Sequence, residues 1–212
     1  RWLYESLRFL FNHIEELDQP EFGSYFKDFL EIMAVRYAEG RLFTEEDMLK
    51  KYGDIPVYAF NFVDYILWKN REELGRKYKG VKFDHFKFAY RRSIEHWFPQ
   101  HPNSDEKIEK MDDQFLHSFG NLCIITDSQN SKFGNLVPSA KYKQWEGIFD
   151  RQSLKLQIMA NITEKTKWES YQIKGLEKEI LPIGYGAMLT EGFIAMMALI
   201  AATALHPDDY FA

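Results

Sequence analysis

Two short segments of this chain have the pattern of β-strands, one by alternation and one as a buried apolar run, and helical periodicity surrounds both. The first covers residues 92–98 and ends at a proline, and the second is the apolar run 120–126. A polar stretch from 101 to 114 joins them, and we expect a helix directly after the second strand, capped by Asp127 or Ser128. The order strand, loop, strand, helix predicts a mainly α fold with a small β-hairpin embedded in helices.

The other patterned segments carry apolar residues at the spacing of amphipathic helices. They comprise residues 1–17, 21–38, 44–52, 57–78 and 142–180. Their aromatic stripes are expected in the core. We therefore predict a helical connector over residues 1–79, a second domain over 80–180 that helices close, and a separate apolar tail over 181–212.

Composition excludes disorder and several kinds of site. The 212 residues are 45% hydrophobic and 17% aromatic, which is enough for a genuine core. Cys123 is the one cysteine, so the chain can form neither a disulfide framework nor a thiolate zinc site, and we expect Cys123 to be a small buried hydrophobe. A reducing compartment, the cytoplasm, is the expected location. Because the chain opens with Arg1 and shows no signal peptide, we expect it to begin inside a longer protein.

The net charge of -5 conceals a basic stretch. Residues 68–100 carry 9 Lys/Arg against 4 Asp/Glu, a balance of +5, and residues 128–145 carry three Lys and no acid. These two basic segments flank the acidic loop between the predicted strands. Each fits either a solvated surface or a local patch that docks phosphates, and charge alone leaves both interpretations open.

The composition changes abruptly at Pro182. From Ile183 to Leu205 the one charged residue is Glu191. Counted from residue 180, this apolar segment is long enough to cross the ~30 Å hydrocarbon core of a bilayer. It equally fits a buried terminal helix, and periodicity does not choose between the two.

Oxygen ligands and a histidine come together if the two strands pair. Pairing would bring Glu95 and His96 on the first strand close to Asn130 at the start of the following helix. Carboxylate and amide oxygens suit Mg²⁺ or Mn²⁺, and one such ion neutralises charge that develops on a leaving 3′ oxygen. His96, held by a hydrogen bond to its second ring nitrogen, could then deprotonate an attacking water.

Each of these residues also has a purely structural interpretation. His96 fits a hydrogen-bonded, partly buried histidine, Asn121 fits a turn residue, and Asn130 fits a helix cap. No spacing links the histidines at 85, 101 and 117 to a tetrahedral metal site. The sequence contains no glycine-rich phosphate loop, serine nucleophile elbow or HExxH helix, so those enzyme classes are excluded.

Three ordered motifs carry a family resemblance. They are Ser-Ile-Glu-His-Trp-Phe-Pro-Gln at 93–100, His-Ser-Phe-Gly-Asn-Leu at 117–122, and Asn-Ser-Lys-Phe-Gly-Asn at 130–135, followed by Lys141. Over residues 80–180 the chain resembles the C-terminal nuclease domain (DUF1524) of GmrSD-type restriction endonucleases, a variant of the HNH, or ββα-metal, nucleases. Residues 1–79 resemble the helical connector that precedes this nuclease. The upstream nucleotide-binding DUF262 domain that the family usually carries is absent from the chain.

The resemblance implies a role for each motif residue. His96 would be the general base, and Glu95 stands where the family often has a metal-binding Asp. Asn121 would brace the loop that orients the histidine, and Asn130 would complete the Mg²⁺ or Mn²⁺ site. Phosphate contacts would come from Lys132 or Lys141, with Asn135 in the same neighbourhood.

The tail carries a different resemblance. Residues 182–212 are similar to an internal membrane segment of the carbon starvation protein A family of inner-membrane peptide transporters. One isolated span cannot form a transport pathway, so this combination indicates a chimeric or misassembled reading frame.

Together these resemblances imply a metal-dependent DNA endonuclease of restriction, phage-defence type, whose substrate is DNA, often with modified bases. Two other hypotheses stay open. One is a fragment of an inner-membrane peptide transporter, whose partner would be the membrane. The other is a catalytically silent DNA-binding module.

Overall fold

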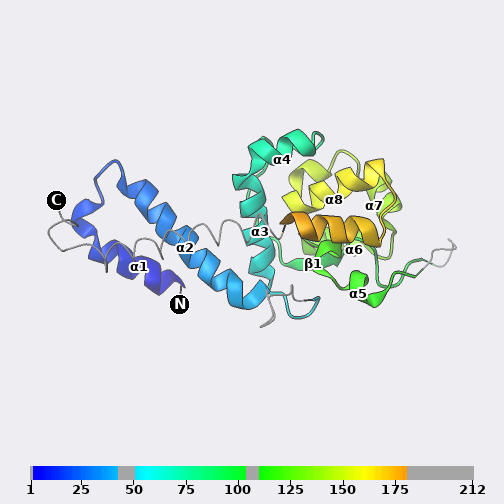
Figure 1. The fold of residues 1–212 in the computed structure, drawn as a ribbon, viewed down its shortest axis with the longest axis horizontal. Helices are drawn as coiled ribbons and strands as arrows, with labels where there is room; N and C mark the ends of the chain where they lie inside the picture. Colours follow the sequence, from blue (N-terminus) through cyan, green and yellow to red (C-terminus); the bar gives the residue numbers. More distant parts are fainter. Residues whose placement is uncertain (1, 43–50, 104–109, 181–212) are drawn as a thin grey trace, which may run out of the picture. The chain divides into compact units, whose positions relative to one another are not determined.

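The structure is a computed structural model that describes residues 2–42, 51–103 and 110–180. The chain divides into two compact units, one containing residues 2–40 and the other containing the described residues from 51 to 180. Figure 1 gives the order of the elements along the chain. The two units are described separately.

The first unit is a pair of helices held by aromatic contacts. It comprises α1 (Trp2–Asn12), the short 3₁₀ helix η1 (Ile14–Glu16) and α2 (Phe22–Leu42). The ring of Phe9 on α1 stacks on Phe29 of α2 at 4.1 Å and on Phe26 at 5.8 Å. Both helices lie where the apolar periodicity predicted them.

The second unit surrounds a two-stranded sheet with helices. Its helices are α3 (Val57–Lys69), α4 (Arg71–Lys77), α5 (Asp113–Leu116), α6 (Asp127–Phe133), α7 (Pro138–Trp145) and α8 (Leu154–Lys165), and residues 170–180 are also helical. Its 3₁₀ helices are η2 (Phe83–His85), η3 (Phe119–Asn121) and η4 (Phe149–Arg151). Strand β1 (Ser93–His96) pairs antiparallel with β2 (Leu122–Ile125). The predicted class, mainly α with a small hairpin, is confirmed.

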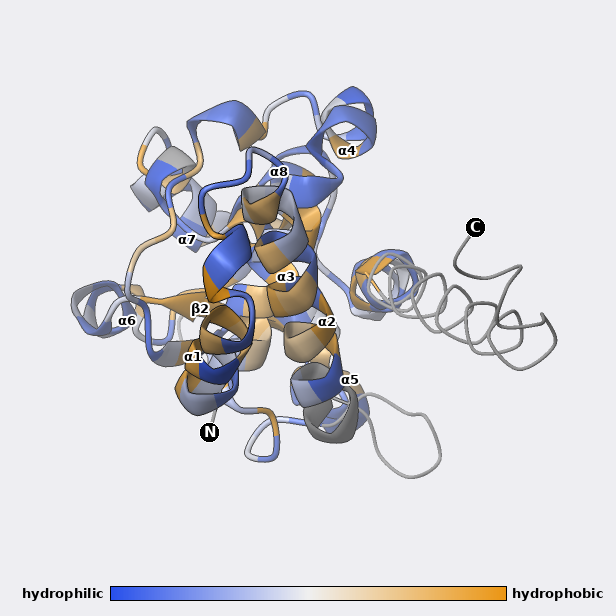
Figure 2. Cartoon of the chain, turned by 90° about the vertical axis from the view of Figure 1, so that its left-hand side faces the viewer, coloured by the Kyte–Doolittle hydropathy of each residue, from blue (hydrophilic) through white to orange (hydrophobic). Residues whose placement is uncertain are grey.

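Helices bury the hairpin, and β2 most completely. All four residues of β2 are buried, and α3 and α8 both pack against this strand. Figure 2 shows β2 coloured as hydrophobic among these helices. On β1 the first two residues are half-buried and the last two, Glu95 and His96, are buried. Two strands alone would be marginal in water, so the helices supply the apolar surface that the sheet needs.

Two long predicted helices are interrupted in the structure. The segment 57–78 forms α3 and α4, separated at Asn70, whose side-chain amide and backbone N–H both donate to the Ile66 carbonyl oxygen at 2.9 and 3.1 Å. A side chain that takes a helical carbonyl in this way competes with helix continuation. The segment 142–180 likewise separates into the end of α7, η4, α8 and the helix at 170–180.

Both strands are shorter than the sequence predicted, and the N-cap of the following helix lies at a different residue. β2 begins at Leu122 because Gly120 and Asn121 belong to η3. The cap of α6 is Thr126, which forms a reciprocal capping box with Gln129, and not Asp127 or Ser128. Asp127 instead pairs with Arg92, with a shortest separation of 2.6 Å.

Gly120 is needed where η3 touches the helix at 170–180. A Cβ atom at this position would lie 2.5 Å from the Ile173 carbonyl oxygen and 2.8 Å from Glu177 Cγ. The Gly120 N–H donates to Glu177 Oε1 at 2.9 Å, and Ile173 is fully buried. This close approach joins the turn before β2 to the last described helix.

Two sequence predictions concern residues outside the described ones, namely most of the helix at 44–52 and the tail at 181–212. Among the described residues, none of the helices is long and apolar enough to cross a membrane. The second unit includes α3 and α4, which precede the expected boundary at residue 80. The division into a connector, a second domain and a tail stays a prediction.

Candidate functional site

The hairpin places the predicted acid and histidine at its buried end. Glu95 pairs with Cys123 and His96 with Leu122 across the two strands. Leu122 directly follows Asn121, so the motif at 93–100 and the motif at 117–122 meet at this end of the sheet. The strand pairing that sequence reasoning assumed is therefore present.

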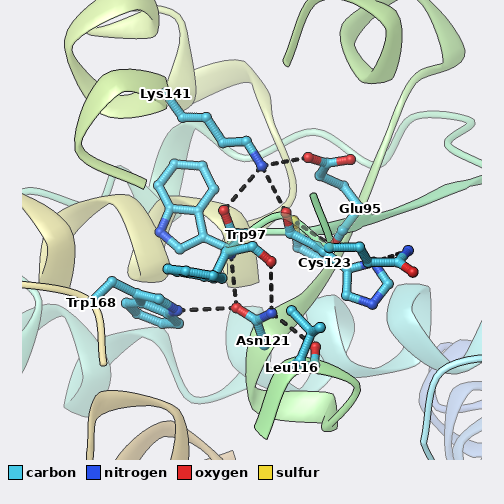
Figure 3. A network of polar contacts seen from close by, with 10 residues as sticks. Glu95, Trp97, Leu116, Asn121, Cys123, Lys141 and Trp168 are labelled. Atoms are coloured by element: carbon cyan, nitrogen blue, oxygen red, sulfur yellow. Dashed lines mark hydrogen bonds and ion pairs between the residues drawn. The ribbon is translucent and has the colours of Figure 1, made fainter. Parts of the chain in front are cut away.

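Lys141 of α7 reaches into this end of the hairpin (Figure 3). Its fully buried ammonium lies 2.6 Å from Glu95 Oε1 and donates to the carbonyl oxygens of His96 at 2.7 Å and Trp97 at 3.0 Å. A cation inserted here neutralises the acid and satisfies two carbonyls beyond the end of the sheet ladder. The phosphate contact expected of Lys141 does not fit this burial, because the ammonium is enclosed and fully engaged.

Burial and pairing act in opposite directions on this ion pair. Burial raises the pKa of Glu95, while the neighbouring Lys141 opposes the rise. Burial lowers the pKa of Lys141, and Glu95 opposes that fall. Each group therefore favours the charged form of the other, and removing one partner would leave the other buried without its counter-charge.

His96 has a partner at each ring nitrogen. Its Nε2 lies 3.2 Å from Nδ1 of His117, and its Nδ1 lies 3.3 Å from Nε2 of Gln100. The ring of Tyr52 packs edge-on against His96 with centroids 4.5 Å apart. Burial, with smaller contributions from His117 and Lys141, lowers the pKa of His96 to about 4. The imidazole is therefore neutral at pH 7 and can accept a proton.

Asn121 uses its whole amide to join segments around the hairpin (Figure 3). Its Oδ1 accepts from the Phe98 N–H at 2.9 Å and from Trp168 Nε1 at 3.1 Å. Its Nδ2 donates to the carbonyl oxygens of Phe98 at 3.0 Å and Leu116 at 2.9 Å. The side chain is fully buried and satisfied, so it holds the segment after β1 against the turn before β2. This geometry suits the bracing role expected of Asn121.

The third motif lies on α6 and in the turn after it. Asn130 is half-buried on α6, Lys132 is exposed on the same helix, and Asn135 is exposed just beyond it. The Lys132 ammonium lies 5.4 Å from the centre of the Trp145 ring. Strand, strand and helix follow one another here as in the predicted ββα arrangement, and α6 packs beside β1.

The donors suit a hard divalent cation but are few. Within the described part of the chain, no group of three or more His, Cys, Asp or Glu side chains could hold a metal. Lys141 engages Oε1 of Glu95, and the described residues show no hydrogen bond to its other oxygen, Oε2. Carboxylate and amide oxygens are ligands that Mg²⁺ and Mn²⁺ accept while retaining several waters. Glu95 and Asn130 are therefore of the right chemical class for such an ion.

Sequence reasoning gave His117 no role, yet it is a direct partner of His96. It lies at the end of α5, and its carbonyl oxygen accepts from the Tyr52 N–H at 2.9 Å. One signal in the sequence could have indicated this contact. His117 lies five residues before Leu122, and Leu122 pairs with His96 once the strands form a hairpin. That signal depends on the register of the hairpin, which the sequence pattern did not specify.

A second buried lysine supports the other side of the hairpin. Lys155 of α8 donates to the carbonyl oxygens of Phe119 at 2.6 Å and of Leu122, and its backbone N–H donates to Asp64 Oδ1 at 3.1 Å. Burial lowers the pKa of Lys155 to about 8, while burial raises the pKa of Asp64 to about 7. Cys123 is also fully buried, as expected, and burial raises its pKa to about 12.

Comparison with known families matches this unit as a whole. The family described as GmrSD restriction endonucleases, C-terminal domain, matches residues 44–182, about two thirds of the chain. The chain belongs to this family. The match includes both strands, α6 and both buried lysines. Because the family is one of restriction endonucleases, this unit is a nuclease of restriction type whose substrate is DNA.

The tail matches a different family. The family described as carbon starvation protein CstA matches residues 170–212. The chain is 59% identical over 34 residues to the peptide transporter CstA of Bacillus subtilis, covering 16% of this chain and 6% of that protein. It is 63% identical over 30 residues to the pyruvate/proton symporter BtsT of Escherichia coli, covering 14% of this chain and 4% of that protein. The chain thus spans only a small part of these relatives.

The two family matches overlap at residues 170–182. The helix at 170–180 packs against Gly120 of the GmrSD C-terminal domain and contributes the buried residues Ile173 and Leu176. This helix is therefore integrated in the nuclease unit. No solved structure matches the chain.

Proposed function

We propose that this chain hydrolyses DNA phosphodiester bonds in a reaction that depends on Mg²⁺ or Mn²⁺, with His96 as general base. The observation that carries the proposal is His96 itself, a buried, neutral imidazole held at both ring nitrogens at the end of β1. A neutral imidazole has a lone pair that can accept a proton from water as the bond to phosphorus forms, which is the role of a general base.

Each step uses an atom of the described site. A water oxygen gives its proton to His96 and forms a bond to phosphorus, and the bond between phosphorus and the 3′ oxygen then breaks. The leaving oxygen takes its proton from solvent. A divalent ion, when bound, would neutralise charge on the phosphate and the leaving oxygen. Glu95, through Oε2, and Asn130 are the residues that would hold it.

The other motif residues would orient the reactants. Asn121 keeps the segment after His96 in place through four hydrogen bonds. Lys132 and Asn135 are exposed around the end of α6, where they would contact DNA phosphates. Lys141 is reassigned from phosphate binding to holding Glu95 and the end of β1, because its ammonium is enclosed.

This nuclease domain would act in restriction, and the upstream nucleotide-binding domain of the family would supply nucleotide control. We propose phage DNA, including DNA with modified bases, as the substrate. This part of the proposal rests on the resemblance described from the sequence, and the test therefore uses both unmodified and base-modified plasmid.

The test is nicking of supercoiled plasmid by the full chain with Mg²⁺, Mn²⁺ or EDTA. The His96→Ala variant is compared with His85→Ala, which removes an exposed histidine outside the site. We expect metal-dependent nicking that His96→Ala abolishes and His85→Ala retains. Nicking in EDTA, nicking that survives His96→Ala, or a folded wild-type chain that neither cuts DNA nor binds Mn²⁺ would overturn the proposal.

A further inference from the structure

We propose that His117 is a positioning residue that sets the proton arrangement of His96. His117 accepts the proton on Nε2 of His96, which leaves the lone pair of Nδ1 to take a proton from water. The inference rests on the proposed function, since it names the residue that orients the base of that reaction.

The hydrogen bonds around His96 specify one tautomer. The Nε2 atom of Gln100 is an amide nitrogen and can only donate, so Nδ1 of His96, 3.3 Å away, is the acceptor. A neutral imidazole with Nδ1 unprotonated carries its proton on Nε2. That proton points to Nδ1 of His117 at 3.2 Å, which must therefore be the acceptor. Gln100 therefore donates to His96, and His96 donates to His117.

The surroundings of the pair make this arrangement effective. His96 is 5% exposed, whereas His117 is only half-buried, so His117 faces solvent from the outer side of the pair. Among the residues that the structure describes, charged groups near His96 include Lys141, which donates to its carbonyl oxygen, and Glu95, which neutralises Lys141. Neither contacts the imidazole ring nitrogens. His117 and Gln100 therefore determine how the ring is protonated.

The arrangement also serves the step after proton transfer. When Nδ1 of His96 takes a proton from water, the ring becomes an imidazolium, and its Nε2–H continues to donate to His117. A hydrogen bond from a charged donor is shorter and stronger than one between neutral groups. His117 thus remains the partner of Nε2 before and after the proton transfer. For this transfer a water takes the place of the exposed Gln100 amide at Nδ1.

The variants separate positioning from packing. His117→Ala removes the acceptor and also the ring that stacks with Tyr52 at a centroid distance of 6.1 Å. His117→Asn removes the ring as well but retains an acceptor, because the Asn side-chain oxygen can occupy the place of Nδ1. The backbone bonds of residue 117, from its N–H to Asp113 and from Tyr52 to its carbonyl, do not involve the side chain. His85→Ala serves as the matched control at an exposed histidine.

The first readout does not require turnover. Nitrogen NMR of the full chain, labelled at histidine, reports which ring nitrogen of His96 carries the proton, and the signals of His96 are assigned by their loss in His96→Ala. We expect the Nε2–H tautomer in wild type, in His117→Asn and in His85→Ala. In His117→Ala we expect a mixture of tautomers. The Nδ1–H tautomer in wild type, or an unchanged Nε2–H tautomer in His117→Ala, would overturn the inference.

The second readout is metal-dependent plasmid nicking by the same proteins. We expect the rate to fall on the order of 10- to 100-fold in His117→Ala, since an unoriented base loses much of its contribution. We expect His117→Asn to recover to within about threefold of wild type. Equal losses in both variants, at equal melting temperature, would mean that the ring matters for packing and would overturn the inference. A chain that never cuts DNA but shows the expected tautomers would contradict the proposed function alone.

Discussion

Replacing Lys141 by Met tests the buried ion pair that closes the end of the hairpin. The substitution keeps a side chain of similar length on α7 but removes the ammonium that contacts Glu95 Oε1 at 2.6 Å and two carbonyl oxygens at 2.7 and 3.0 Å. The Glu95 carboxylate is then left buried without its partner, and the carbonyls of His96 and Trp97 lose a donor.

The magnitude follows from these contacts. Removing one partner of a buried ion pair costs about 3–5 kcal/mol, because the remaining charge is uncompensated. The two carbonyls add to this cost, so we expect the free energy of unfolding to fall by about 4–5 kcal/mol at pH 7. Against a typical total of about 5–15 kcal/mol, such a loss would be a large share of the stability. Lys143→Met, an exposed lysine on the same helix, should change stability by less than about 0.5 kcal/mol.

The assay is urea denaturation followed by tryptophan fluorescence and circular dichroism. The double variant Lys141→Met with Glu95→Gln should recover part of the loss, because the stranded charge is removed. A loss below about 1 kcal/mol in Lys141→Met would refute the assignment. Lys141→Met could instead lower the affinity for DNA and weaken the dependence of that affinity on salt by about one phosphate contact. Lys141 would then be a phosphate-binding residue, as the family resemblance implies.

Three further substitutions test the interior. The pKa of Asp64 in the folded chain, near 7, lies above its ordinary value of 3.8. The stability that Asp64 contributes is therefore complete below pH 3.8 and is lost as the pH rises to about 7. Asp64→Asn should remove this pH-dependent loss, on the order of 4 kcal/mol, in urea unfolding measured from pH 4 to 8. Gly120→Ala should cost about 2 kcal/mol in the same assay because its Cβ meets the Ile173 backbone, whereas Gly175→Ala, with open space around it, should not destabilise. Asn121→Ala leaves four buried partners unsatisfied and should lower the free energy of unfolding by about 3 kcal/mol or more; an unchanged thermal midpoint would contradict the bracing role.

Much of the fold was accessible from local pattern. Apolar spacing predicted the helices at 21–38 and 57–78. Alternation predicted the first strand and an apolar run the second, each within two residues of its observed ends. The errors fell where side chains compete with the backbone. Asn70 interrupts a helix by bonding to the Ile66 carbonyl, and Thr126 takes the cap that the following acid was expected to provide. These choices depend on individual hydrogen bonds that hydrophobic periodicity does not register.

Most residues of the candidate site were also predictable from the sequence, but their contacts were not. The sequence by itself determined which chemistry is present: an acid and a histidine on one strand, amides in two later motifs, and a family that the whole unit then confirmed. Only the tertiary structure decided what each group contacts. It enclosed Lys141, for which the family resemblance implied a phosphate contact, and it brought His117 to His96 across 21 residues of chain. Burial and hairpin register determine these contacts, and both arise from packing between segments that are distant in sequence.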